Sequence, residues 1–231
     1  MRGNIPVRTL ALLIALPAFA LGGCVHSQVY PVSRAGWTPR DNEFLGNARY
    51  VQAAIPKAYQ RQLVDFHRRE VAGTIVVDTD ERFLYYVLPD GKAIRYGVTV
   101  GEDALAWSGV AKIGRMQEWP SWVPTPEIKQ RIANLPNYVG PGPDNPMGAR
   151  GLYLYLRNKD TLYRIHGTNQ PEYIGRAISS GCIRMTNEDV IDLYNRVRVG
   201  TVVVVLAPAR SVRLPLNEAR PHFRITTAAA T

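Results

Sequence analysis

Residues 165–185 read IHGTNQPEYIGRAISSGCIRM, and this stretch decides the fold. It contains two short motifs, Ile165-His166-Gly167-Thr168 and Ser179-Ser180-Gly181-Cys182-Ile183-Arg184-Met185. The first motif ends an alternating apolar run, which predicts a strand, and the second directly precedes a predicted helix. His166 lies 16 residues before Cys182, so the chain is long enough to fold back and bring the imidazole and the thiol together.

The second motif has the composition of a reactive thiol site. The guanidinium of Arg184 favours a thiolate over a thiol. Gly181 lets a substrate carbonyl approach closely, and the backbone N–H groups around Cys182 can face that carbonyl as an oxyanion hole. A buried Cys packed as a small hydrophobe and a structural His remain alternatives. A zinc site would be two ligands short.

A Cys/His pair is sufficient for acyl transfer. The imidazole takes the thiol proton, the thiolate attacks a carbonyl, and the imidazolium protonates the leaving amine. The motifs therefore predict a cysteine acyltransferase with Cys182 as nucleophile and His166 as general base and acid. This chemistry needs no metal and no cofactor.

The surrounding sequence is mostly strand-like. Runs of β-branched and aromatic residues predict strands at 74–78, 82–88, 93–100, 109–116, 152–156, 162–166 and 201–206. Asp90-Gly91 is a hairpin signal between the second and third of these strands. The Gly- and Pro-rich residues 136–150 predict an exposed loop near the site.

Few helices are expected. Thr125-Pro126 opens a short helix that ends near Ala133, and residues 49–70 could form another that docks on the main domain. Thr186 caps a further helix that runs to about Arg198 and stops at Gly200. Its predicted buried stripe is Val190, Leu193, Tyr194 and Val197.

The N-terminus has the pattern of an export signal. Residues 1–23 combine a basic start with an apolar run that is too short to span a bilayer. Leu21-Gly22-Gly23-Cys24 resembles a lipobox, in which Cys24 is lipidated; cleavage after Ala18-Phe19-Ala20 is the alternative. We therefore expect a periplasmic protein held by a lipid anchor, with the outer membrane favoured because Val25 follows the cysteine, or a secreted one. Each cysteine then has its own role, and no disulfide is expected between Cys24 and Cys182.

Composition limits the partners. The chain has 231 residues, 46% of them hydrophobic, with a net charge of +9, or about +7 without the two arginines of the signal segment. A basic surface favours an anionic partner, but no nucleic-acid-binding fingerprint is present. We expect residues 24–70 to be a tether and N-terminal extension, 71–206 the catalytic domain, and 207–231 a disordered basic tail.

The paired motifs closely resemble the catalytic signature of the L,D-transpeptidase family (YkuD-type, ErfK/YbiS/YcfS/YnhG-like). The family pattern is H-G-T, a spacer of about a dozen residues, and S-H-G-C-[IV]-R-[ML]. The resemblance extends from about Val71 to Leu206, and it includes Pro146-Met147-Gly148. It implies a mostly β, sandwich- or barrel-like domain with one or two short helices. Ser180 replaces the usual His, which puts any role for a second imidazole in doubt.

The resemblance also implies roles for residues. Cys182 and His166 would be the catalytic pair, and the amides of Ser180, Gly181 and Cys182 the oxyanion donors. Arg184 would hold the loop or a substrate carboxylate, although a structural salt bridge is equally expected. The substrate-binding candidates are Gly167, Ser179 and Tyr155 together with Arg184. Tyr153 is a further candidate for lining the cleft, with core packing the favoured role for both tyrosines.

The implied substrate is the stem peptide of peptidoglycan. Cys182 would attack the carbonyl of the third residue of a tetrapeptide stem and release D-Ala. The acceptor would be a neighbouring stem amine, giving a 3→3 cross-link, a lysine of an outer-membrane protein, or water. A wall-binding lipoprotein without turnover and a sortase-like transpeptidase are the rivals, and the tight His–Cys spacing argues against the sortase.

Overall fold

The computed structural model describes residues 28–50, 53–101, 107–177 and 182–208. The predicted signal segment, Cys24, the oxyanion candidates Ser180 and Gly181, and the substrate candidate Ser179 lie outside these ranges, as does most of the predicted tail. The predictions that depend on those residues therefore stay predictions.

The described chain is mostly β, as predicted. Its strands are β1 (Gln28–Val29), β2 (Gln62–Asp65), β3 (Ile75–Asp78), β4 (Phe83–Val87), β5 (Lys92–Gly97), β6 (Thr99–Val100), β7 (Gly109–Glu118), β8 (Arg150–Leu156), β9 (Lys159–His166), β10 (Ile183–Arg184) and β11 (Val202–Val205). The helices are α1 (Pro39–Gly46), α2 (Pro126–Arg131) and α3 (Asn187–Arg196), with short 3₁₀ turns η1 (Lys57–Tyr59) and η2 (Pro171–Tyr173). Each predicted strand corresponds to an observed one, except that residues 93–100 divide into β5 and β6.

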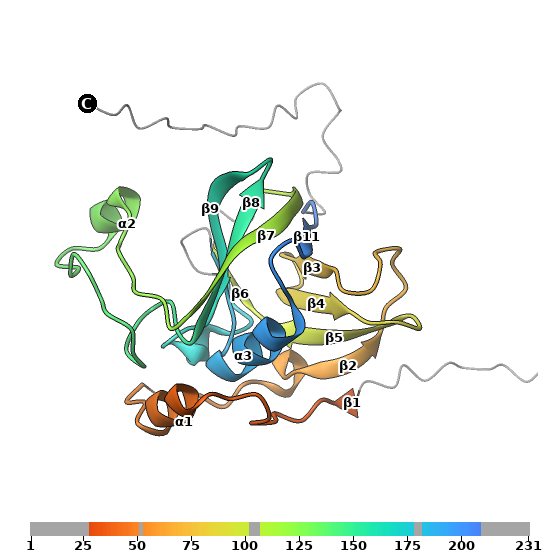
Figure 1. The fold of residues 1–231 in the computed structure, drawn as a ribbon, viewed down its shortest axis with the longest axis horizontal. Helices are drawn as coiled ribbons and strands as arrows, with labels where there is room; N and C mark the ends of the chain where they lie inside the picture. Colours follow the sequence, from red (N-terminus) through yellow and green to blue (C-terminus); the bar gives the residue numbers. More distant parts are fainter. Residues whose placement is uncertain (1–27, 51–52, 102–106, 178–181, 209–231) are drawn as a thin grey trace, which may run out of the picture.

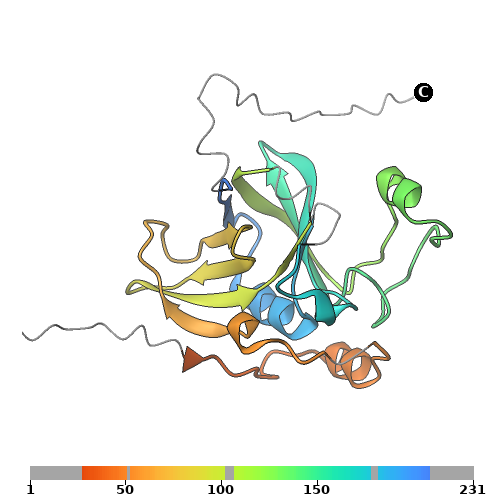
Figure 2. The same ribbon diagram turned by 180° about the vertical axis from the view of Figure 1, so that it is seen from behind.

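All these strands belong to one strongly bent sheet in the order β1-β2-β5-β4-β3-β11-β7-β8-β9-β10-β6. The bend places β2 to β5 on one side and β7, β8 and β9 on the other (Figures 1 and 2). Helix α3 lies at the base, where it packs against both halves. The parallel pair of β3 and β11 joins the halves through strands of valine and isoleucine.

Alternation of side chains along the strands builds the core. Val203 and Val205 of β11 point inward beside Ile75 and Val77 of β3, and all four are buried. Full burial of each such side chain contributes about 1.5–3 kcal/mol. The core continues through β8, β9 and β10, so the strands that carry the two motifs are backed by rigid packing.

The turn between β4 and β5 follows the prediction. Asp90 and Gly91 both have positive φ, +60° and +66°, as a tight hairpin turn of this hand requires.

Helix α3 begins as predicted and ends early. The Thr186 hydroxyl accepts a hydrogen bond from the Asp189 amide at 3.1 Å, which caps the first turn. The helix stops at Arg196 rather than Arg198, because Val197 already has extended backbone angles. Its buried face is Val190, Ile191 and Leu193, whereas Tyr194 and Val197 are half-buried.

The prediction of a helix within residues 49–70 is wrong. The described part of this segment forms η1 and then β2, which pairs antiparallel with β5. Val64 and Phe66 are both buried, a spacing of two that fits a strand, and β2 lies between β1 and β5 in the sheet. The apolar residues are too sparse to have shown this period in the sequence.

The residues expected to be a tether contain β1 and α1, which lie along the base of the domain (Figure 1). Asp41 of α1 is completely buried. Its carboxylate pairs with both terminal nitrogens of Arg150 at 2.6 and 2.7 Å and accepts a hydrogen bond from Trp119 Nε1 at 2.8 Å. Burial alone would raise the pKa of Asp41, but Arg150 and the Thr38 amide outweigh it and lower the pKa. This segment is therefore anchored to β8 by a buried ion pair.

Candidate active site

The two sequence motifs meet where β9 and β10 lie side by side. These strands are parallel, with Ile183 opposite Ile165 and Arg184 opposite His166. The Met185 amide donates to the His166 carbonyl at 2.8 Å, which fixes the register at the C-terminal end. On its other edge, β10 pairs with β6, and the Gly101 amide donates to the Cys182 carbonyl at 3.3 Å. The segment that carries the thiol is thus held from both sides.

Alternation places the thiol and the imidazole on one face of this sheet. Ile165 and Ile183 point into the core, so His166 and Cys182 point to the opposite face. Cys182 stands one position before Ile183 and therefore beside Arg164, diagonal to His166. For neighbouring strands about 4.8 Å apart with a rise of about 3.3 Å per residue, the two Cα atoms are separated by about 8 Å. Side chains on this diagonal can reach one another.

The neighbouring backbone orients His166. Its Nδ1 lies 2.6 Å from the Gly167 carbonyl oxygen. A carbonyl oxygen can only accept, so Nδ1 carries the proton and Nε2 keeps its lone pair. His166 is 4% exposed, which limits other orientations of the ring. The backbones of Gly167 and Met147 both hydrogen-bond to the ring, and each contact raises its pKa. A neutral imidazole with one unprotonated nitrogen is the form that a general base requires.

Two pKa shifts of opposite direction describe the resting pair. Burial lowers the pKa of His166 to about 3, and the charge of Arg184 adds to this shift. Burial raises the pKa of the Cys182 thiol, although Arg164 and Arg184 partly offset it. Cys182 is half-buried, and within the described residues its thiol is free. Both shifts favour the neutral forms of the two groups, a thiol and an imidazole.

Asn187, the first residue of α3, connects the backbone on both sides of the histidine. Its Oδ1 accepts a hydrogen bond from the Ala149 amide at 2.8 Å, and its Nδ2 donates to the Thr168 carbonyl at 2.9 Å. Nδ2 also donates to the Tyr50 hydroxyl at 3.0 Å, a contact from the N-terminal extension. A Cβ on Gly167 would lie 2.2 Å from Asn187 Oδ1. Gly167 therefore acts by leaving room for this amide.

The comparison with family models identifies the domain. Residues 72–205 match the model described as YkuD, the L,D-transpeptidase catalytic domain. The chain belongs to the L,D-transpeptidase family.

Two curated relatives agree with this assignment. The chain is 39% identical over 141 residues to the probable L,D-transpeptidase ErfK/SrfK of Escherichia coli K12, and 35% identical over 139 residues to the probable L,D-transpeptidase YbiS of that strain. Each match covers 57% of this chain and 43% of the relative, so the chain spans less than half the length of these relatives. A solved structure described as a probable carnitine operon oxidoreductase caia from Brucella melitensis is 48% identical, covering 66% of this chain and 96% of that one with a TM-score of 0.45.

The remaining substrate-binding candidates of the L,D-transpeptidase domain are placed differently. Arg184 lies beside His166 on the exposed face of the sheet, and burial lowers its pKa. Tyr155 is half-buried and packs over Gly114, where an added Cβ would lie 2.3 Å from the tyrosine ring. Tyr155 stands opposite Lys112 and Asp160. It is two residues along β8 from Tyr153, which shares a row across the sheet with Arg164 and Cys182. Tyr153 stands opposite Arg115 and Arg164, and these two arginines cover its ring, which is 6% exposed. It lies outside the hydrophobic core clusters, so the core packing favoured for it is not confirmed.

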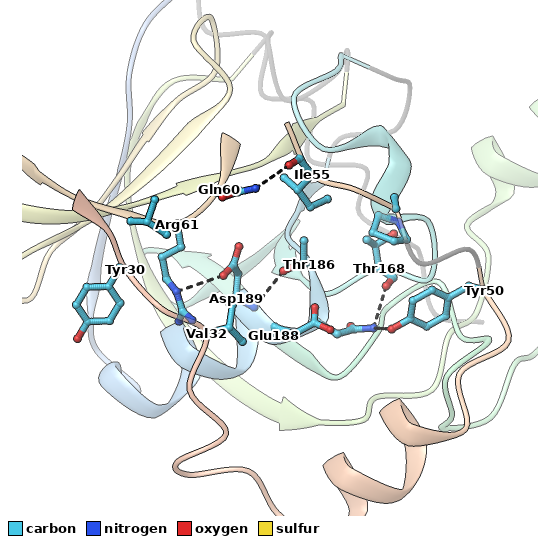
Figure 3. Close-up of a pocket in the computed structure, with 14 residues that line it drawn as sticks. Tyr30, Val32, Tyr50, Ile55, Gln60, Arg61, Thr168, Thr186, Glu188 and Asp189 are labelled. Atoms are coloured by element: carbon cyan, nitrogen blue, oxygen red, sulfur yellow. Dashed lines mark hydrogen bonds and ion pairs between the residues drawn. The ribbon is translucent and has the colours of Figure 1, made fainter. Parts of the chain in front are cut away.

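A pocket of about 360 Å³ lies elsewhere in the transpeptidase domain, between the N-terminal extension and the start of α3 (Figure 3). Its lining includes neither Cys182 nor His166. At its wall, Arg61 pairs with Asp189 at 3.5 Å and with Asp192 at 2.8 Å. Burial raises the pKa of Asp189 to about 7 despite Arg61. The pocket is a seam between two segments, and Arg61 and Asp189 in its wall are already paired.

The sequence pattern does not single out two residues of the site. Asn187 is visible there only as part of a helix start, because its partners are 19 to 137 residues away in the chain. Arg164 is visible only as a strand residue, yet it precedes His166 by two positions, and the period of a strand places both on one face. The spacing of two residues between Arg164 and His166 is thus a signal in the sequence that could have indicated Arg164.

Among the described residues, no three His, Cys, Asp or Glu side chains gather closely enough to hold a metal ion. In the same part of the chain, no helix is both long and apolar enough to cross a membrane.

Proposed function

We propose that this domain is a peptidoglycan L,D-transpeptidase that forms an acyl-enzyme on Cys182. The observation that supports it most is the common face of β9 and β10, where the half-buried thiol stands diagonal to a buried imidazole whose Nδ1 is fixed by the Gly167 carbonyl. A thiol without a neighbouring base, or an imidazole without a free nitrogen, could not perform acyl transfer.

The reaction proceeds in two steps. His166 Nε2 accepts the thiol proton as Sγ attacks the carbonyl of the third stem residue, and the amides of Ser180, Gly181 and Cys182 stabilise the oxyanion. The imidazolium then protonates the leaving D-Ala amine, the C–N bond breaks, and a thioester remains. An amine next attacks the thioester, His166 takes its proton, and the thiol is released as the new amide forms.

The acceptor and the location are parts of this proposal. The acceptor is the side-chain amine of a neighbouring stem, giving a 3→3 cross-link, or a lysine of an outer-membrane protein, with water giving carboxypeptidase activity. The protein works in the periplasm, held at the outer membrane through lipidated Cys24. The lipobox-like Leu21-Gly22-Gly23-Cys24 and the basic composition, suited to an anionic wall polymer, support this.

Purified protein and disaccharide-tetrapeptide muropeptides test the proposal. Mass analysis after incubation should find free D-Ala together with dimers or tripeptide monomers, and Cys182→Ala should produce neither. Activity should survive chelation of divalent metals. Unchanged muropeptides with the wild-type protein would instead favour the rival hypothesis, a wall-binding protein without turnover.

A further inference from the structure

Three side chains form a row across the exposed face of the sheet and lead to the thiol. Arg115 of β7 stands opposite Tyr153 of β8, and Tyr153 stands opposite Arg164 of β9. Cys182 follows at the next position, because Ile183 pairs with Ile165. Strands β7, β8 and β9 lie side by side in both views of the fold (Figures 1 and 2).

The central ring holds both arginines. The guanidinium carbon of Arg115 lies 3.6 Å from the centroid of the Tyr153 ring, and that of Arg164 lies 4.4 Å from it. Tyr153 is 6% exposed, and its hydroxyl donates to Gln117 at 3.2 Å, so the ring is a fixed platform. A cation–π contact at this distance holds the guanidinium of Arg115 in place and leaves its N–H donors available for an anion.

The two arginines of this row differ in whether a carboxylate compensates their charge. Arg164 is paired with Asp160 through two contacts of 2.7 and 2.9 Å, and it is largely covered. Arg115 is exposed, and in the described part of the chain no carboxylate pairs with it. Two cations over one ring repel each other, and one acidic side chain compensates only one of them. The row therefore retains an uncompensated positive charge on Arg115, three strands or about 14 Å across the sheet from Cys182.

We propose that Arg115, held on the Tyr153 ring whose other face is covered by Arg164, is a subsite for a carboxylate of the acyl-donor peptide. The planar guanidinium fork matches a carboxylate with two parallel hydrogen bonds. Because this subsite is on the same row as Cys182, a donor held there by a carboxylate has its backbone drawn along the row toward Sγ. This inference rests on the proposed function, and it adds that the preferred donor carries free rather than amidated carboxylates.

Binding measured without turnover tests the subsite. Cys182→Ala protein is titrated with a stem tetrapeptide bearing free carboxylates and with the same peptide fully amidated. Adding Arg115→Gln should weaken binding of the free acid about tenfold or more, the usual effect of losing a hydrogen bond to a charged group, and leave the amidated peptide unchanged.

Arg40→Gln is the matched control. Arg40 is also exposed and lies over an aromatic ring, 5.8 Å from the centroid of Phe44, but on α1. The control variant loses the same charge and should bind both peptides as before. The subsite is refuted if Arg115→Gln leaves the affinity for the free acid unchanged, or if Arg40→Gln weakens it equally.

Failure of the proposed function is a separate outcome. If the wild type releases no D-Ala while Arg115→Gln still selectively weakens binding of the free acid, the catalytic proposal fails and the carboxylate subsite stands. If D-Ala is released and the variant binds both peptides normally, the reverse holds.

Discussion

At the residue scale, burial favours the neutral forms of Cys182 and His166, the proposed catalytic pair. The low pKa of His166, about 3, and the raised pKa of Cys182 have the same cause, burial of groups that would otherwise be charged. Arg164 and Arg184 stabilise a thiolate but disfavour an imidazolium, so they act in opposite directions on the two partners. The fixed Nδ1–Gly167 contact keeps Nε2 ready to take the proton when substrate arrives.

The free enzyme should therefore lack a preformed thiolate near neutral pH. The rate of Cys182 alkylation by iodoacetamide should rise continuously with pH to beyond pH 9, because the pKa of this thiol is raised above its ordinary value of 9.0. Mass spectrometry of the modified protein across pH 5 to 10 measures this rate. An inflection below pH 7 would instead indicate a thiolate–imidazolium pair.

Gly167 should tolerate no side chain. In Gly167→Ala, the added Cβ meets Asn187 Oδ1 at 2.2 Å and the Ala149 amide at 2.9 Å. We expect a loss of about 1–3 kcal/mol of unfolding free energy, together with reduced acylation, because the carbonyl that orients His166 shifts. Gly46→Ala is the control, since nothing lies within 4 Å of its added Cβ. Chemical denaturation of both variants measures the difference, and equal stabilities would contradict the steric account.

The sequence motifs indicate Cys182 and His166 as the candidate pair, but they do not indicate the contacts that position these two residues. Cys182 and His166 stand in short local motifs whose spacing carries the information. Asn187 and Tyr50 meet across 137 residues, and no pattern in either segment indicates the other. Hydrogen bonds of that kind depend on the folded arrangement of three separate segments.

At the element scale, α1 is an integral part of the domain although it precedes the matched family region. Its Thr38 capping box starts the helix, and Asp41 within that box continues to Arg150 and Trp119. Arg150 follows the Pro-Met-Gly segment, and its carbonyl accepts the Gly167 amide at 3.1 Å. Since Gly151 of β8 pairs with His166, Arg150 lies one position from the residue opposite His166. The buried ion pair therefore reaches the strand next to the candidate site. The sequence showed only polar, Pro-punctuated residues here, because one buried carboxylate leaves no periodic signature.

Removing this anchor should be costly. Asp41→Ala leaves the buried guanidinium of Arg150 without its partner, which typically costs about 3–5 kcal/mol. Thermal unfolding should show a large fall in Tm. Glu70→Gln is the control, since it removes an ion pair to the half-exposed Arg68, and such pairs contribute about 0–1 kcal/mol. Similar Tm values for the two variants would show that Asp41 does not anchor the helix.

At the scale of the whole molecule, one bent sheet accounts for the fold. The strand runs were predictable because alternation and hairpin signals are local, whereas the sheet order, with β11 between β3 and β7, depends on pairing of segments far apart in the chain. Placing β10 beside β9 is the step that turns two motifs into one site.

Global stability should depend on pH through His166. Folding lowers the pKa of His166 from 6.5 to about 3. Between these two pH values the imidazole is therefore protonated in the unfolded chain and neutral in the folded chain. The contribution of the neutral imidazole to the free energy of unfolding is fully present above pH 6.5, and it is lost as the pH falls toward 3. Urea midpoints measured from pH 8 to 4 should fall more steeply for the wild type than for His166→Gln. Parallel curves would mean that the imidazole is not buried.

The central claim is that the Sγ atom of Cys182, activated by His166, becomes acylated. Intact-protein mass measured after incubation with a carbapenem, a β-lactam acylating agent, tests it most directly. We expect the wild type to gain the mass of one carbapenem on the peptide that contains Cys182, His166→Gln to gain it far more slowly, and Cys182→Ala to gain none. An adduct formed at the normal rate on Cys182→Ala would contradict the account.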